Sequence, residues 1–211
     1  MRYLAYDTET TGLSKHCNVL TAYFIVLDEN LKEIAKLDLK IKHEKYNIYA
    51  KAMEINKIDL VQHEKIATTV DESKEILEKF LIENRSSNGI PYTSGETKLP
   101  PSYKQIGHNL IFDINMILNN KLICREFYNE NMTEEYIDTY SLCRIYRSEK
   151  LITCKSLTLE NICKYFEIEI NSNNLHTAEY DIKMTIELYK KLREFRNENF
   201  GTKFIFSERK N

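Results

Sequence analysis

The sequence lacks several features that would assign the chain to special classes of protein. No apolar run approaches the ~20 residues that a membrane-spanning helix needs, so we expect no transmembrane segment. The formal charge is −2 at pH 7, which excludes a polybasic nucleic-acid binder, because that binding mode needs a strong positive excess. The first residues contain no apolar stretch or cleavage site of a secretory signal. We therefore expect an intracellular protein, cytoplasmic or nuclear, that is not associated with a membrane.

Cysteine pairs with metal-ligand or disulfide spacing are also missing. There are five cysteines, an odd number, and no CxxC motif occurs. This pattern disfavours a zinc site or a disulfide framework and favours reduced thiols. The five are Cys17, Cys124, Cys143, Cys154 and Cys163.

Proline is scarce, and its distribution suggests the domain organisation. All three prolines lie within 84–105, a loop of roughly 20 residues, which is long for a compact domain. We expect a surface insertion there, with a functional flap as the alternative. Hydrophobic residues make up 42% of the chain, enough for a buried core. The predicted organisation is one domain over 1–196, interrupted by this loop, and a C-terminal tail over 197–211.

Hydrophobic periodicity predicts strands followed by alternating helices and strands, which indicates an α/β domain with a mixed sheet. The first three strands, joined by tight turns, should be antiparallel. Asp71 is the expected N-cap of the first helix. The expected strands are 2–7, 20–27, 33–42, one ending at 106–107 and 135–139, and the expected helices are 71–84, 109–119, 156–166 and 177–196.

Acidic residues occupy three places where a structural residue would be apolar. Asp7 and Glu9 are two apart at the end of the first strand, so both point to one face and repel each other unless a cation lies between them. Asp113 falls beside an apolar helix stripe, where an unpaired carboxylate is costly. Carboxylate oxygens are ligands that Mg²⁺ prefers. The alternatives are capping acids at a solvated strand end and a helix acid that reaches water.

The third place is the start of the last helix. Asp181 faces the core in line with Met184 and Leu188, and His176 lies on the loop that enters the helix. A histidine there can accept a proton from a metal-bound water. The alternative is a polar helix-cap cluster.

Taken together, these three motifs resemble those of one family. Residues 6–13 read YDTETTGL, residues 107–113 read GHNLIFD, and His176 and Asp181 form H-x-x-x-x-D. The sequence resembles the DEDDh (DnaQ-like) 3′→5′ exonucleases over roughly residues 3–195, including an Asp138-Thr139 pair before connecting helices. The loop at 84–105 and the tail lie outside the resemblance. It implies an RNase H-like fold, with a mixed five-stranded sheet flanked by helices on both sides.

The resemblance also implies a two-metal site. Asp7, Glu9, Asp113 and Asp181 would hold two divalent ions, Mg²⁺ or Mn²⁺, about 4 Å apart. His176 would act as general base on the attacking water. Each turnover would release a nucleoside 5′-monophosphate from the 3′ end.

A terminal-nucleotide pocket follows from the same resemblance. Backbone groups of Thr10, Thr11 and Gly12 would contact the 3′ end, and Leu13 would pack on the last base. His108 and Asn109 would lie beside the pocket. Because base stacking is sequence-tolerant, unpaired or frayed ends are the expected substrate. Basic residues near 144–155 and 183–193 either line the path of the nucleic-acid strand or form solvated helix faces, and the second interpretation is favoured.

The function predicted in this way is a metal-dependent 3′→5′ exonuclease, with DNA slightly favoured over RNA. The alternatives are an exoribonuclease, a short-oligonucleotide phosphodiesterase of the same fold, or a nucleic-acid-binding module without activity. The partners expected are DNA or RNA 3′ ends and a polymerase or other replication or repair protein acting in trans.

Overall fold

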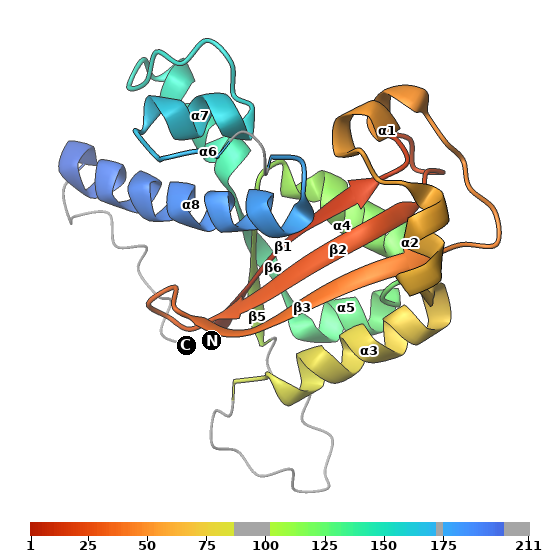
Figure 1. The fold of residues 1–211 in the computed structure, drawn as a ribbon. Coiled ribbons are helices and arrows are strands. Elements are labelled where there is room, and N and C mark those ends of the chain that lie inside the picture. The colour runs from red at the N-terminus through yellow and green to blue at the C-terminus, as the bar shows by residue number, and fades with distance from the viewer. Residues whose placement is uncertain (87–101, 172–174, 201–211) are drawn as a thin grey trace, which may run out of the picture.

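The computed structural model describes residues 1–86, 102–171 and 175–200. Most of the predicted loop at 84–105 and of the predicted tail at 197–211 therefore lies outside the described residues. At the centre is a six-stranded mixed sheet with strand order β4-β3-β2-β1-β5-β6 (Figure 1). The strands are β1 Arg2–Thr10, β2 Val19–Leu27, β3 Glu33–Lys42, β4 Thr68–Thr69, β5 Tyr103–Gly107 and β6 Met132–Asp138.

The predicted sheet is confirmed as α/β and mixed, with one strand more than the expected five. Strands β1, β2 and β3 are consecutive antiparallel neighbours, as predicted, and β5 and β6 run parallel to β1. The sixth strand, β4, consists of two threonines paired with the end of β3 at the sheet edge. Two polar residues show no alternation of apolar and polar side chains, so the sequence pattern misses this strand.

Helices lie on both sides of the sheet, as predicted (Figure 1). Four of them correspond to the predicted helices: α3 Val70–Glu83, α4 Leu110–Asn119, α7 Leu159–Tyr165 and α8 Ala178–Phe200. The last runs four residues beyond its predicted end at 196. The others are α1 Ala50–Asn56, α2 Leu60–Ile66, α5 Arg125–Asn131 and α6 Thr139–Ser148.

The predicted N-cap of α3 is wrong. Thr69 is the N-cap, and its side chain accepts a hydrogen bond from the backbone N–H of Glu72, whose carboxylate accepts one from Thr69 in return. Asp71 lies in the first turn instead, where a negative charge is still favourable beside the positive end of the helix dipole. The capping box starts two residues earlier than expected because the two threonines of β4 lead straight into the helix.

The two faces of β1 pack against different helices. Leu4 and Tyr6 belong to a core shared with α3, α4 and α5, and Ala5 belongs to a second core beneath α8. Because side chains alternate along a strand, Asp7 and Glu9 continue the α8 side, and Thr8 continues the α4 side. The end of β1 is thus where the two layers of helices both reach the sheet.

A third core joins α6 and α7 to the far half of α8. It includes Cys143, Cys154 and Cys163, and all five cysteines of the chain are free. Burial raises the pKa of the Cys143 and Cys163 thiols to about 12, so both are neutral packing groups. Of the helices in the described parts of the chain, none has both the length and the apolar character that a membrane crossing requires.

Candidate active site

Three carboxylates meet where β1 ends beneath the start of α8. Asp7 and Glu9 project from the same face of β1, and Asp181 comes from the first turn of α8. Each offers an oxygen, and these three oxygens lie within 4.8 Å of one another. Residues 172 positions apart in the sequence thus form one acidic group.

This crowding makes ionisation unfavourable for each of the three carboxyls. Burial, followed by the charges of Asp113, Glu9 and Asp181, raises the pKa of Asp7 well above its usual range. Burial and the charge of Asp181 raise the pKa of Glu9 to about 8. Burial raises the pKa of Asp181 to about 6, although the positive charge and a backbone hydrogen bond of His176 oppose the rise. The site therefore favours bound protons or a bound cation.

One oxygen of this group has no hydrogen-bond partner among the described residues. Asp181 Oδ1 is buried, and no donor among the residues that the structure describes is hydrogen-bonded to it. A buried acceptor without a partner costs roughly 1–3 kcal/mol, more if it is charged. A divalent cation held by the three carboxylates would satisfy this atom and reduce the mutual repulsion. The donor set thus fits the Mg²⁺ or Mn²⁺ that the motifs predict.

The fourth predicted carboxylate lies beside the group of three. Asp113 is in the first turn of α4 and is only 4% exposed, so the alternative of a helix acid that reaches water is wrong. Its Oδ1 accepts hydrogen bonds from the backbone N–H of Thr8, at 3.0 Å, and from Thr8 Oγ1, at 2.6 Å. Burial raises its pKa to about 7, and both bonds from Thr8 oppose the rise. Thr8, which lies between Asp7 and Glu9 on β1, thereby links Asp113 to that strand.

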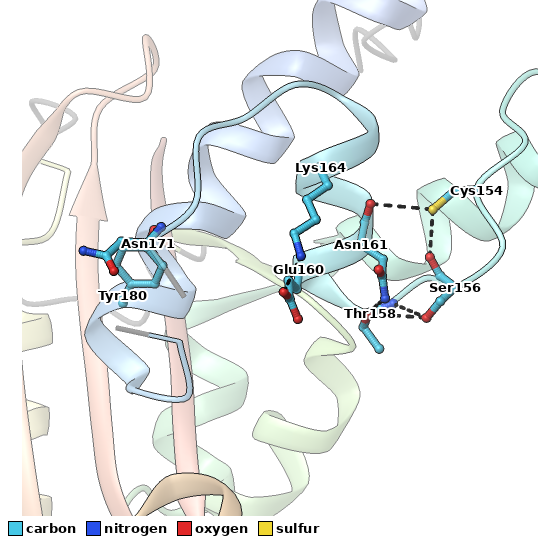
Figure 2. Close-up of polar contacts among 8 residues, drawn as sticks. All are labelled: Cys154, Ser156, Thr158, Glu160, Asn161, Lys164, Asn171 and Tyr180. Atoms are coloured by element: carbon cyan, nitrogen blue, oxygen red, sulfur yellow. Dashed lines mark hydrogen bonds and ion pairs between the residues drawn. The ribbon is translucent and has the colours of Figure 1, made fainter. Parts of the chain in front are cut away.

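His176 lies at the edge of this site. It is exposed, two residues before α8, and its backbone has a φ of 67°, in the left-handed region. Its charge acts on Asp181 and also lowers the pKa of Glu160, after the larger effects of Lys164. Figure 2 shows Glu160 on α7 paired with Lys164. His176 therefore lies between the acidic group and the start of α7, in contact with solvent.

The predicted terminal-nucleotide residues follow β1 directly. The carbonyl of Thr11 accepts a hydrogen bond from the Tyr49 backbone N–H at 2.8 Å, and Thr11 Oγ1 donates to the Asn47 carbonyl at 2.6 Å. Thr10 Oγ1 donates to the Gly12 carbonyl at 2.8 Å. The turn at 10–12 is thus fixed by the segment that leads into α1.

Gly12 is required for packing in this turn. A Cβ at Gly12 would lie 2.6 Å from Cδ2 of Tyr49 and 2.8 Å from Cys17 Sγ, closer than real contacts allow. Leu13, the next residue, is 85% exposed, and Tyr49 is 56% exposed. An aliphatic side chain and an aromatic ring near Gly12 are therefore both exposed to solvent. The sequence motifs contain no signal for Tyr49, since it precedes a seven-residue helix without a side-chain cap.

His108 and Asn109 hold neighbouring segments together. His108 Nδ1 lies 2.9 Å from Thr139 Oγ1, and Nε2 donates to the Leu157 carbonyl at 2.9 Å. Asn109 is in the left-handed region with a φ of 63°, and its backbone N–H donates to Asp138 Oδ1 at 2.7 Å. The ends of β5 and β6 and the segment before α7 are thus tied together beside Asp113.

Comparisons with known proteins find similarity to an exonuclease family model and to a DNA polymerase. Residues 102–189 match a family model described as Exonuclease. The chain is 24% identical, over 94% of its length, to a PolC-type DNA polymerase III from Ureaplasma parvum, but it spans only 12% of that protein.

The fold recurs in solved structures of exonuclease I. The E. coli enzyme in complex with a dT13 oligonucleotide has a TM-score of 0.70 and 16% identity over 93% of this chain and 42% of that one. Exonuclease I from Methylocaldum szegediense has a TM-score of 0.68 and 18% identity over 92% of this chain and 42% of that one. The chain thus spans less than half the length of either relative. The three motifs are thus assembled on a fold that this chain shares with exonuclease I, and residues 102–189 match the Exonuclease family model.

Proposed function

We propose that the chain is a divalent-metal-dependent 3′→5′ exonuclease that releases nucleoside 5′-monophosphates from single-stranded or frayed ends. The observation that carries this proposal is the acidic group of Asp7, Glu9 and Asp181, with a buried oxygen for which the described parts of the chain offer no donor. Asp113, held by Thr8, is the fourth member that we assign to the metal centre. Four carboxylates are enough to hold two ions, and we propose Mg²⁺ or Mn²⁺ on the basis of the oxygen ligands.

The chemistry is hydrolysis of the last phosphodiester bond. The bound ions supply positive charge to the phosphate and to the water and leaving oxygens that surround it. The carboxylates fix the position of that charge, and β1 and α8 are rigid elements that hold the carboxylates. The water oxygen forms a bond to phosphorus, and the bond from phosphorus to the 3′ oxygen of the preceding nucleotide breaks.

We propose that His176 accepts the proton of the attacking water. The residue is exposed at the edge of the acidic group and acts electrostatically on Asp181. A neutral imidazole there can take the proton, and solvent can remove it afterwards, because the ring is not enclosed. The left-handed backbone at this position places the residue outside the helix that begins at Ala178.

The terminal base is proposed to lie against Leu13. Its 85% exposure, directly after the fixed turn at 10–12, leaves an apolar side chain in water with no packing role. Tyr49 offers a ring across Gly12, and aromatic stacking on a base is worth roughly 1–3 kcal/mol. A pocket that stacks the base on protein favours an end that is not already paired.

Digestion of four labelled substrates tests the function: DNA and RNA, each single-stranded and as a blunt duplex, with Mg²⁺ or Mn²⁺. We expect stepwise shortening from the 3′ end and 5′-monophosphate products. Absence of any product with either ion would leave a nucleic-acid-binding module as the function. Faster loss of dinucleotides than of longer strands would instead indicate a short-oligonucleotide phosphodiesterase.

We favour DNA over RNA as substrate. The PolC-type relative is by name a DNA polymerase, and one exonuclease I structure contains a dT13 oligonucleotide. We also propose a polymerase as a partner, because that relative is by name a DNA polymerase. A greater rate on RNA than on DNA in the digestion would reverse the substrate assignment.

A further inference from the structure

A second polar pocket lies beside the acidic group, outside the carboxylates and the terminal-base residues. Its volume is about 360 Å³, in the lower part of the range of ligand sites, about 300–1,000 Å³. It is bounded by the start of α4, by α6 and by the segment that enters α7. Its polar and aromatic lining comprises Asn109, Tyr140, Arg147, Lys155, Ser156 and Thr158.

The lining carries positive charge, and no acidic side chain among the described residues is paired with it. Arg147 and Lys155 are both exposed and none of the lining residues is acidic. Most other lysines on the helices nearby are paired with glutamates, such as Lys164 with Glu160 at 2.5 Å and Lys183 with Glu179 at 2.5 Å. In the described ranges, neither Arg147 nor Lys155 has an acidic partner within 4 Å.

The wall that bears Lys155 is fixed by its own hydrogen bonds. The backbone N–H of Thr158 donates to Ser156 Oγ at 3.4 Å, and Asn161 Nδ2 donates to Thr158 Oγ1 at 2.7 Å (Figure 2). The Cys154 thiol donates to the Ser156 carbonyl at 2.9 Å. Arg147 Nη1 reaches the Lys155 carbonyl at 3.4 Å, so the two cations are held on neighbouring segments. A pocket that is ordered before binding loses less entropy when a ligand binds.

The pocket is connected to the catalytic residues on both sides. Asn109, on its rim, immediately precedes the helix that carries Asp113. Leu157, also in the lining, accepts the hydrogen bond of His108, and Thr158 is two residues before Glu160, whose carboxylate interacts with His176. A strand whose 3′ end lies at Asp7 and Asp181 has this positively charged hollow within reach of its preceding nucleotides.

We infer that this pocket, with Arg147 and Lys155 as its anion ligands, binds a phosphodiester of the substrate strand upstream of the bond that is cleaved. The inference rests on the proposed function. Phosphate contacts of this kind position a strand without reading its sequence. The chain as a whole is slightly acidic, so two cations with no acidic partner in the described ranges give the polyanion a local attraction beside the proposed metal centre that the net charge does not provide.

The double variant Arg147→Gln/Lys155→Gln tests the inference with two substrates. One is a single-stranded decanucleotide, and the other is the p-nitrophenyl ester of thymidine 5′-monophosphate, which has no upstream nucleotide. We expect KM for the decanucleotide to rise about tenfold or more, with kcat within about twofold of the parent, and the ester to be hydrolysed as before. The dependence of log KM on log salt should weaken by about 1.4, the value for two contacts to a single strand.

The matched control is Arg144→Gln/Lys150→Gln, which removes the same charge from the same helix and its C-terminal end without altering the pocket lining. It should leave KM and the salt dependence unchanged. An equal rise in KM in the control would show a diffuse electrostatic effect and would overturn the inference. So would an unchanged KM in the pocket variant, or an equal loss on the mononucleotide ester.

Failure of the proposed function is distinguishable from failure of this inference. If the parent protein hydrolyses neither substrate, the function is wrong. Binding of the fluorescently labelled decanucleotide in EDTA, followed by anisotropy, still tests the pocket, and the Arg147/Lys155 variant should then raise Kd about tenfold relative to parent and control. An unchanged Kd would reject the pocket as a phosphate site.

Discussion

At the scale of single residues, the candidate site consists of carboxylates at positions where a structural residue would be apolar. Asp7 and Glu9 were predictable from the two-residue alternation of a strand, and Asp113 from its place beside the apolar stripe of α4. The hydrogen bonds that position these groups were not predictable. The bond from Thr8 to Asp113 joins residues 105 positions apart, and no local pattern encodes such a pair.

Asp181→Asn should abolish exonuclease activity while the metal-free fold remains at least as stable. The change removes one of three crowded charges, so repulsion with Glu9 decreases. Activity should fall by more than about 10³-fold, because metal ligation supplies several kcal/mol of transition-state stabilisation and each 1.36 kcal/mol is about tenfold. The measurements are 5′-monophosphate release and urea unfolding in EDTA. Parent-like rates would refute the assignment of this carboxylate to the metal centre.

His176→Gln should lower kcat by about 10²–10⁴-fold, the usual contribution of a general base. The residue is exposed at the rim, so loss of the ring should not disturb folding. Thermal stabilisation by Mn²⁺ should remain as in the parent, which separates a proton-transfer role from metal binding. A variant that loses both the Mn²⁺ effect and activity would contradict the role we assign.

At the scale of elements, long periodic segments were predicted, whereas of the seven-residue helices only α7 was. The strands of the antiparallel half and helices α3, α4 and α8 follow clear apolar periods. Helices α1, α2 and α5 have only seven residues each, less than two full turns of pattern. Helix α6 was missed for another reason: Asp138 ends β6 and also caps the helix, so no turn residues separate the two elements.

His108→Ala should loosen the connection between β5 and the segment before α7. The change removes the contacts to Thr139 and to the Leu157 carbonyl, which is then left without this donor. The expected cost in unfolding free energy is about 1–3 kcal/mol. Urea unfolding measures it, and amide hydrogen exchange over 154–158 should become faster. His108→Gln, whose amide can still donate, is the control and should retain part of the stability.

At the scale of the whole molecule, the order of strands in the sheet could be proposed only through family resemblance. Nothing in the local pattern of β5 or β6 specifies that they run parallel to β1, although the antiparallel order of the first three strands followed from their short turns. The assembly of the acidic group depends on that global order, because Asp113 and Asp181 reach β1 from opposite faces of the sheet.

The stability of the metal-free protein should fall as pH rises from about 5 to about 8.5. The pKa values of Asp181, Asp113 and Glu9 are raised in the folded chain, to about 6, 7 and 8, chiefly by burial. Folding therefore favours bound protons: the stabilising effect is complete below the ordinary carboxyl pKa and is lost as pH passes through the folded values. Urea unfolding in EDTA at several pH values measures this effect.

Saturating Mn²⁺ or Mg²⁺ should reverse this loss at pH 8, since an ion that binds only the folded form adds about 2.7 kcal/mol at a concentration one hundred times its Kd. Asp7→Asn, which lacks the most crowded charge, serves as the comparison and should show a shallower pH dependence in EDTA. A parent protein with flat stability across this range would argue against the electrostatic crowding described above.

The position of Asp181 in α8, and of His176 just before that helix, has a consequence for biosynthesis. A growing polypeptide in which only the residues up to α4 have been made already contains Asp7, Glu9 and Asp113. It lacks Asp181, which completes the acidic group, and His176, the proposed general base. Under the proposed chemistry, a ribosome-bound chain stays inert toward the nucleic acids around it until translation has passed α8.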